Sequence, residues 1–270
     1  MAPQAPVAPD VLALAEDLNT HIPVSPGAER IVDERFVIWL GANASEPSFT
    51  VVQRLRLEPS TVEPTVAHVR ALLDDRGRSS RTWEVGPSAT PPDLDTRLEA
   101  LGMGPFQEPL TVGMVMTEPP PDVPGVEARR ALTVEDHTSA ERILARGFEM
   151  DAPEEEIARQ VAMGMDGDRT GVGAVYLAWI DGQPVAAAQA VFTERGVMMS
   201  GGATLPAARG RGAYRALVAA RWRDAVARGV PVLVTQAGAM SRPILRRLGF
   251  REVCQIRIFL DGAASAGADR

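Results

Sequence analysis

The sequence predicts an α+β protein with a mixed sheet, and three observations indicate this fold class. In the second half of the chain, the patterns run strand, two helices, three strands, helix, strand, helix, strand. Two of these strands flank Asp181-Gly182, a dipeptide typical of two-residue hairpin turns. The first half carries a weaker copy of the last five patterns, which indicates an internal repeat.

The first half is expected to begin with a tail and a helix over residues 1–29. After these, alternating apolar residues predict strands, and a spacing of 3.6 residues predicts helices. The strands are expected over 48–57, 81–89 and 109–117, and the helices over 61–75 and 90–103. The second helix follows a Thr-Pro pair and ends at Gly102, because proline favours helix starts and glycine favours helix ends.

The second half follows the same rules. Strands are expected over 126–132, 174–180, 183–192, 196–205, 230–238 and 251–260, and helices over 133–148, 152–165, 213–226 and 241–250. Thr133 is the expected N-cap of the first helix, and the glycines inside 196–205 indicate a bulge or a close approach of another backbone. We expect Tyr176 and Trp179 in the core and His137 on an exposed helix face.

A proline-dense segment separates the halves, because its prolines fix φ and lack an N–H donor. We therefore expect a linker over 118–125, between a degenerate lobe over 30–117 and a larger domain over 126–262. Residues 263–270 are small or polar and are expected to form a flexible tail.

The composition excludes several classes of protein. A formal net charge of −7 excludes a nucleic-acid protein that is basic over its whole surface. No run of about 20 apolar residues predicts a membrane span, and the first ten residues lack the pattern of a signal peptide. Cys254 is the one cysteine, and the three histidines are scattered, so we expect no metal site and a reducing cytoplasm. All 28 basic residues are arginine, which favours a GC-rich bacterial genome.

The most specific motif is "LPAARGRGAYRAL", residues 205–217, which follows a strand and opens a helix. Helix N-termini attract anions, and glycines let a phosphate approach the backbone closely. Arg209 and Arg211 add cations whose geometry suits phosphate oxygens. The chain has no lysine and hence no P-loop motif, and its GxG pairs lack the third glycine of a dinucleotide fold. The run therefore predicts a pyrophosphate site, and the alternative interpretation is an arginine-rich, solvated helix start.

The motif and the order of elements resemble the GNAT superfamily of acyl-CoA-dependent N-acyltransferases. The family pattern Arg/Gln-x-x-Gly-x-Gly/Ala falls on Arg209, Gly212 and position 214, where this chain has Tyr214. The resemblance covers residues 126–262 and implies a splayed mixed sheet flanked by helices, preceded by a smaller, degenerate GNAT-like lobe. It also implies acetyl-CoA as cosubstrate. The residues implied to bind it are Ala203, Thr204, Leu205, Arg209, Gly210, Arg211, Gly212, Ala213, Tyr214 and Arg215.

The resemblance gives the catalytic residues less directly. In many family members a tyrosine protonates the departing thiolate, but Leu245 stands at that position here. Ser241, at the start of the same helix, is a candidate donor and equally fits an N-cap. Glu149 and Asp151 precede the second helix of the domain, and they are candidates for removing a proton or attracting a cationic amine.

Two functions follow as alternatives. The first is an enzyme that transfers an acetyl or related acyl group from acetyl-CoA to an amine of a small molecule or protein. The second is a catalytically silent acyl-CoA-binding or scaffold protein, which Leu245 favours. Neither involves a nucleic acid or a membrane, and a homodimer is compatible with both.

Overall fold

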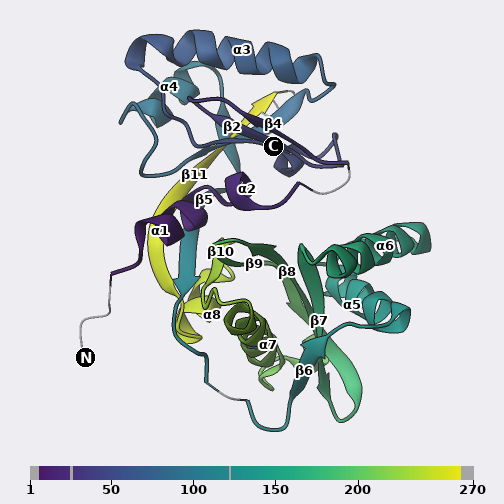
Figure 1. Ribbon diagram of the computed structural model, residues 1–270. Helices are drawn as coiled ribbons and strands as arrows, with labels where there is room; N and C mark the ends of the chain where they lie inside the picture. Colours follow the sequence, from purple (N-terminus) through teal and green to yellow (C-terminus); the bar gives the residue numbers. More distant parts are fainter. Residues whose placement is uncertain (1–5, 25–26, 122, 263–270) are drawn as a thin grey trace. The chain divides into compact units, whose positions relative to one another are not determined.

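A computed structural model of the chain describes residues 6–24, 27–121 and 123–262 (Figure 1). Contacts between residues divide it into two compact units. Unit 1 comprises residues 1–114, 236–243 and 252–270, and unit 2 comprises 115–235 and 244–251. The tail expected over 263–270 lies outside the described residues.

Unit 1 is built on strands in the order β1-β2-β3-β4-β11-β5. Its strands are β1 (Glu29–Val32), β2 (Val37–Leu40), β3 (Thr50–Gln53), β4 (Ser80–Val85), β5 (Gly104–Met116) and β11 (Arg251–Gly262), except that Val115, Met116 and Arg251 are counted with unit 2. Its helices are α1 (Pro9–Glu16), α2 (Leu18–His21), α3 (Val62–Asp74) and α4 (Leu94–Ala100). β3 and β4 are parallel, whereas β1, β2 and β3 pair antiparallel, so the sheet is mixed as expected.

The last strand of the chain belongs to unit 1. β11 pairs antiparallel with β4, from Arg257 opposite Val85 to Gly262 opposite Ser80. The domain expected from the sequence covers residues 126–262, and the contacts count the described residues 252–262 with unit 1. Sequence patterns show that a strand is present but not which strand it pairs with, because pairing depends on contacts distant in sequence.

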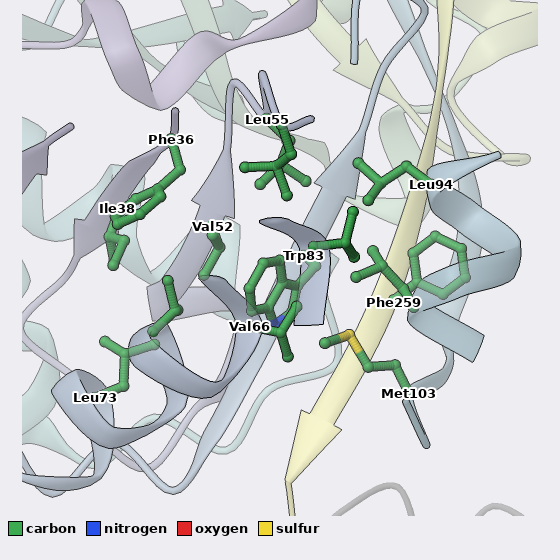
Figure 2. Packing of buried hydrophobic residues seen from close by; sticks show 14 of the residues in the cluster. Phe36, Ile38, Val52, Leu55, Val66, Leu73, Trp83, Leu94, Met103 and Phe259 are labelled. Atoms are coloured by element: carbon green, nitrogen blue, oxygen red, sulfur yellow. The ribbon is translucent and has the colours of Figure 1, made fainter. Parts of the chain in front are cut away.

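The core of unit 1 contains side chains from strands and helices that precede β4 in the chain and from others that follow it. Figure 2 shows Trp83 of β4 among Val52 of β3, Val66 of α3 and Phe259 of β11. Trp83 is fully buried. The chain thus completes this core only when its C-terminal strand is in place.

Unit 2 holds strands in the order β10-β9-β8-β7-β6. They are β6 (Glu127–Arg130), β7 (Gly173–Ile180), β8 (Gln183–Thr193), β9 (Gly196–Thr204) and β10 (Leu233–Ala237), of which the last two residues are counted with unit 1. The helices are α5 (Val134–Gly147), α6 (Glu154–Thr170), α7 (Ala213–Ala227) and the short α8 (Arg242–Arg247), whose first two residues are likewise counted with unit 1. In Figure 1, α5 and α6 cover one face of β7 and β8, and α7 covers the other.

Local signals in unit 2 agree with the sequence expectations. The Thr133 hydroxyl accepts from the Asp136 amide at 3.1 Å and so caps α5. Asp181 and Gly182 both have positive φ, as the turn between β7 and β8 requires. The bulge falls at Gly201, because Ala188 pairs with Gly202 while Gln189 pairs with Ser200. The α+β fold with a mixed sheet is confirmed.

Residues 29–40 form a hairpin of β1 and β2, although their sequence pattern predicts neither strand. Each strand has only four residues, so neither gives a clear alternation. Their length explains why they were missed.

Candidate functional site

The residues of the arginine- and glycine-rich run form a turn between β9 and α7. A short 3₁₀ turn, η3 (Pro206–Ala208), follows β9, and α7 begins at Ala213. Gly210 has φ 78° and Gly212 has φ 89°, conformations that side chains with a Cβ rarely adopt. The two glycines therefore allow the chain to turn sharply into the helix.

Backbone donors gather at this turn. Among the described residues, five successive or near-successive amides donate no hydrogen bond: those of Gly210, Gly212, Ala213, Tyr214 and Arg215. The first intrahelical bond that follows is from the Ala216 amide to the Gly212 carbonyl, at 3.0 Å. Free amides at the positive end of a 15-residue helix have the geometry and the partial charge that suit an anion.

The arginines of the turn are exposed, and two of them have partners. The Arg211 guanidinium pairs with the Asp181 carboxylate at 2.9 Å, and both side chains are more than half exposed. Arg209 Nε donates to the Thr204 carbonyl at 3.4 Å. Exposed ion pairs contribute at most about 1 kcal/mol, so an anionic ligand can replace Asp181 as the partner of Arg211.

Tyr214, the departure from the family pattern, packs away from the turn. A Cβ on Gly202 would lie 2.8 Å from its ring, so the ring rests against the glycine of β9. The buried Arg221 guanidinium lies 5.8 Å from the centre of the same ring. Gly202 therefore makes room for Tyr214, and the turn itself stays open.

The proline-dense segment also contacts the turn. A Cβ on Gly212 would lie 2.7 Å from Cγ1 of Val123. Beside it, Val123 and Pro124 border a hollow of about 250 Å³ whose other wall includes Ala216 of α7. Gly212 is thus required both by its φ and by its neighbour.

The backbone of β9 offers a free edge next to the turn. Within the part of the chain that the structure describes, β10 pairs with β9 at Val197 and Met198, and the later residues of β9 have no strand partner on that edge. The Leu205 amide donates to the Val185 carbonyl at 2.9 Å and is not free. Because successive amides of a strand point to opposite edges, the Thr204 amide faces the free edge. Ala203 is buried against Gly147 of α5.

The two acidic candidates lie in the loop between α5 and α6. Glu149 and Asp151 are exposed, and neither carboxylate has a partner among the described residues. Glu149 has φ 55°, and the Met150 amide donates to the Ala145 carbonyl at 2.9 Å. This is a helix-ending motif that normally places glycine at the left-handed position.

We expect Glu149→Gly to stabilise unit 2 by about 1 kcal/mol, because glycine adopts positive φ without steric cost. Urea unfolding measures the gain. Glu149→Gln is the control, since it removes the charge but keeps the Cβ and should leave stability unchanged. Equal stability of the glycine and glutamine variants would contradict the strain at this position.

The remaining candidates differ in burial. Ser241, counted with unit 1, is half-buried, and its hydroxyl donates to the Gly238 carbonyl at 3.5 Å. Leu245, counted with unit 2, is 2% exposed and packs in the core. The expected core positions are confirmed for Tyr176, which is fully buried, while Trp179 is half-buried under the Arg129 guanidinium.

The prediction for His137 was wrong. We expected it on an exposed helix face, but its side chain is buried, with 2% exposed. Its Nε2 lies 3.2 Å from the Asp168 carboxylate of α6, because α6 packs over the helix face that carries it. On the other face of the sheet, the Tyr176 hydroxyl donates to Asp224, which also accepts from Arg130 at 2.6 Å. Burial, followed by the bond to Asp224, raises the pKa of Tyr176.

Within the described ranges, no helix is long and apolar enough to cross a membrane. Nor do the described residues bring together three or more His, Cys, Asp or Glu side chains that could hold a metal ion.

Comparison with known proteins gives the fold. The sequence matches no family model and no curated protein. The structure is similar to a GCN5-related N-acetyltransferase from Kribbella flavida, with a TM-score of 0.70 and 18% identity over 94% of this chain and 96% of that one. A tandem GNAT protein from the clavulanic acid biosynthesis pathway matches with a TM-score of 0.61 and 15% identity, over 96% of this chain and 90% of the other. A GCN5-related N-acetyltransferase from Sphaerobacter thermophilus matches with a TM-score of 0.61 and 16% identity, over 86% and 82%. The chain therefore has the fold of the GNAT N-acetyltransferases, tandem members included.

Proposed function

We propose that this protein transfers an acetyl or related acyl group from acetyl-CoA to an amine of a small molecule or protein. The observation that carries the proposal is the turn before α7, where free amides, two left-handed glycines and exposed arginines converge. These groups would hold the pyrophosphate of the cosubstrate. The free edge of β9 at Ala203, Thr204 and Leu205 would run beside the rest of the carrier.

The acceptor site is proposed at the loop between α5 and α6. Phe148 and Met150 are 50% and 61% exposed, and they alternate with the exposed carboxylates of Glu149 and Asp151. Such a loop suits an amine cation carried on an apolar body, because the carboxylates attract the charge and the apolar side chains contact the body. The single cysteine supports a cytoplasmic setting for the reaction.

The proposed pyrophosphate site at the turn before α7 is tested by the double variant Arg211→Glu with Gly212→Glu. We expect its affinity for acetyl-CoA to fall at least about 100-fold, because two charge-assisted contacts of about 1.5 kcal/mol each are lost and a carboxylate enters the anion site. Isothermal titration calorimetry measures the affinity.

The matched control lies at the other end of the same helix. Arg228→Glu with Gly229→Glu makes the same change of charge and also replaces a glycine with positive φ. The proposed site would be overturned if the variant at residues 211 and 212 kept its affinity for acetyl-CoA, or if both variants lost the same amount of affinity.

A second candidate function is a binder without turnover, which Leu245 in the core favours, because it leaves no hydroxyl at the family's acid position. The two functions are separated by following release of the CoA thiol across a panel of amines. Sustained, amine-dependent release shows transfer, whereas binding without release shows a binder.

A further inference from the structure

Helix α5 buries a carboxylate that no sequence pattern indicated. Glu141 is 8% exposed and lies beside Ala140 and Leu144 on the helix face that packs against the sheet. Its Oε1 accepts a hydrogen bond from Gln189 Nε2 of β8 at 3.1 Å. A buried acid needs a reason, because burying a carboxyl group costs free energy unless a partner compensates.

Gln189, the partner of Glu141, lies in β8 opposite the bulge in β9. The register between β8 and β9 shifts at Gln189, which leaves Gly201 unpaired and exposed. A Cβ on Gly201 would lie 3.3 Å from Gln189 Oε1, so the glycine leaves the Gln189 amide uncovered. A polar path therefore runs from the exposed bulge through Gln189 to Glu141.

The bulge also lies where the free edge of β9 begins. The last residue of β9 that pairs with β10 is Met198, and the Thr235 hydroxyl donates to the Met199 carbonyl at 3.2 Å. Gly201 follows two residues later. Through Gln189, Glu141 is therefore linked to the place where the free edge of β9, proposed for the acyl carrier, begins.

The charges around Glu141 favour proton uptake. No arginine pairs with it among the described residues; the charged groups that face it are His137 of α5 and Glu156 of α6. Burial raises the pKa of Glu141, and the bond from Gln189 and the charge of His137 only partly oppose this rise. A carboxylate of this kind is a suitable general base for an amine.

We propose that Glu141, positioned by Gln189, accepts the proton that the acceptor ammonium loses before it attacks. This inference rests on the proposed function. One water at the bulge passes the proton to Glu141, and the freed amine nitrogen forms the bond to the acyl carbon. The carbon–sulfur bond then breaks, and the second proton that the nitrogen releases passes to the CoA thiolate, which leaves as the thiol, while the proton on Glu141 returns to solvent. The exposed Glu149 and Asp151 attract the cation, whereas the buried Glu141 takes the proton.

The test is the pH profile of kcat/KM for a fixed amine. Glu141→Gln should lower kcat/KM about 10²- to 10⁴-fold and abolish the acid limb that deprotonation of Glu141 creates. Its affinity for acetyl-CoA should stay within twofold of the unmodified protein. Glu135→Gln, an exposed position on the same helix, is the control and should leave both unchanged.

A second variant separates a positioning role for Gln189 from a structural one. Gln189→Leu removes a bond that holds the pKa of Glu141 down, so the acid limb should move to higher pH. A loss of packing alone would lower activity without moving the limb. This variant also decides the matter if Glu141→Gln does not fold.

Different results would overturn the proposed function and the proposed role of Glu141. If the unmodified protein binds no acetyl-CoA, the proposed function fails. If it turns over and Glu141→Gln keeps the same kcat/KM and acid limb, or Gln189→Leu leaves the limb unmoved, the role of Glu141 is overturned and the function stands.

Discussion

Asp261→Ala is expected to destabilise unit 1 by about 3–5 kcal/mol, because it removes the shared anion of a buried cluster. Asp261 is 4% exposed. Its carboxylate accepts from Arg70 at 2.9 Å and from the indole of Trp83 at 3.2 Å, and it lies 3.4 Å from Arg81. Without Asp261, the buried Arg81 keeps a single ion-pair partner among the described residues, the exposed Asp74 at 3.0 Å.

The consequence extends to the last strand, since Asp261 lies in β11 opposite Arg81 of β4. Losing the anion loosens the strand that supplies Phe259 to the core. Thermal unfolding followed by circular dichroism measures the effect, and a fall of roughly 10 °C is expected at 2–4 °C per kcal/mol. Asp95→Ala breaks the exposed pair with Arg257 of the same strand and should cost less than about 1 kcal/mol. Similar losses in both variants would contradict a special role for the buried cluster.

Glu84→Gln is expected to stabilise the protein at alkaline pH and to have little effect at pH 5. Glu84 is 9% exposed, and its Oε2 has no partner among the described residues. Burial, and then the charge of Asp17, raise the pKa of Glu84 from 4.5 to about 8. Burial and the charge of Glu16 likewise raise the pKa of Asp17, to about 6.

The sign follows from proton binding. Between pH 4.5 and 8 the folded state keeps the proton of Glu84, whereas the unfolded state has released it. Stability therefore falls as pH rises through this window, by at most about 5 kcal/mol for this group. Glutamine cannot ionise, so the variant loses this part of the pH dependence.

Urea unfolding at pH 5 and pH 8.5 measures the free energy of unfolding of both proteins. The advantage of Glu84→Gln should appear only at pH 8.5. Glu63→Gln, exposed on α3, is the control and should follow the unmodified protein at both values. An advantage that is the same at both values would mean that packing, not ionisation, sets the difference.

Much of the fold could be predicted because local signals encode it. The Thr133 cap, the Asp181-Gly182 turn and the bulge near Gly201 all arise from residues close in sequence. The expected strand over 251–260 is present as β11, but its pairing with β4 was not predictable. Side-chain alternation shows that a strand has a buried face, and many partners could cover that face.

Some residues of the candidate site could also be predicted from the sequence, and others could not. Gly210 and Gly212 were recognised as a turn because only glycine tolerates positive φ readily. Glu141 and His137 gave no signal, since a polar residue on a helix is usually exposed. Their burial depends on α6 and β8, which other parts of the chain supply.

By itself, the sequence determined the class of fold and the glycine- and arginine-rich turn, because backbone conformation at such positions is a property of a few adjacent residues. Only the tertiary structure decided where β11 pairs, that Gly202 makes room for Tyr214, and that Glu141 meets Gln189. Each of these depends on close packing between segments far apart in the chain, and burial of a charge is set by everything that surrounds it.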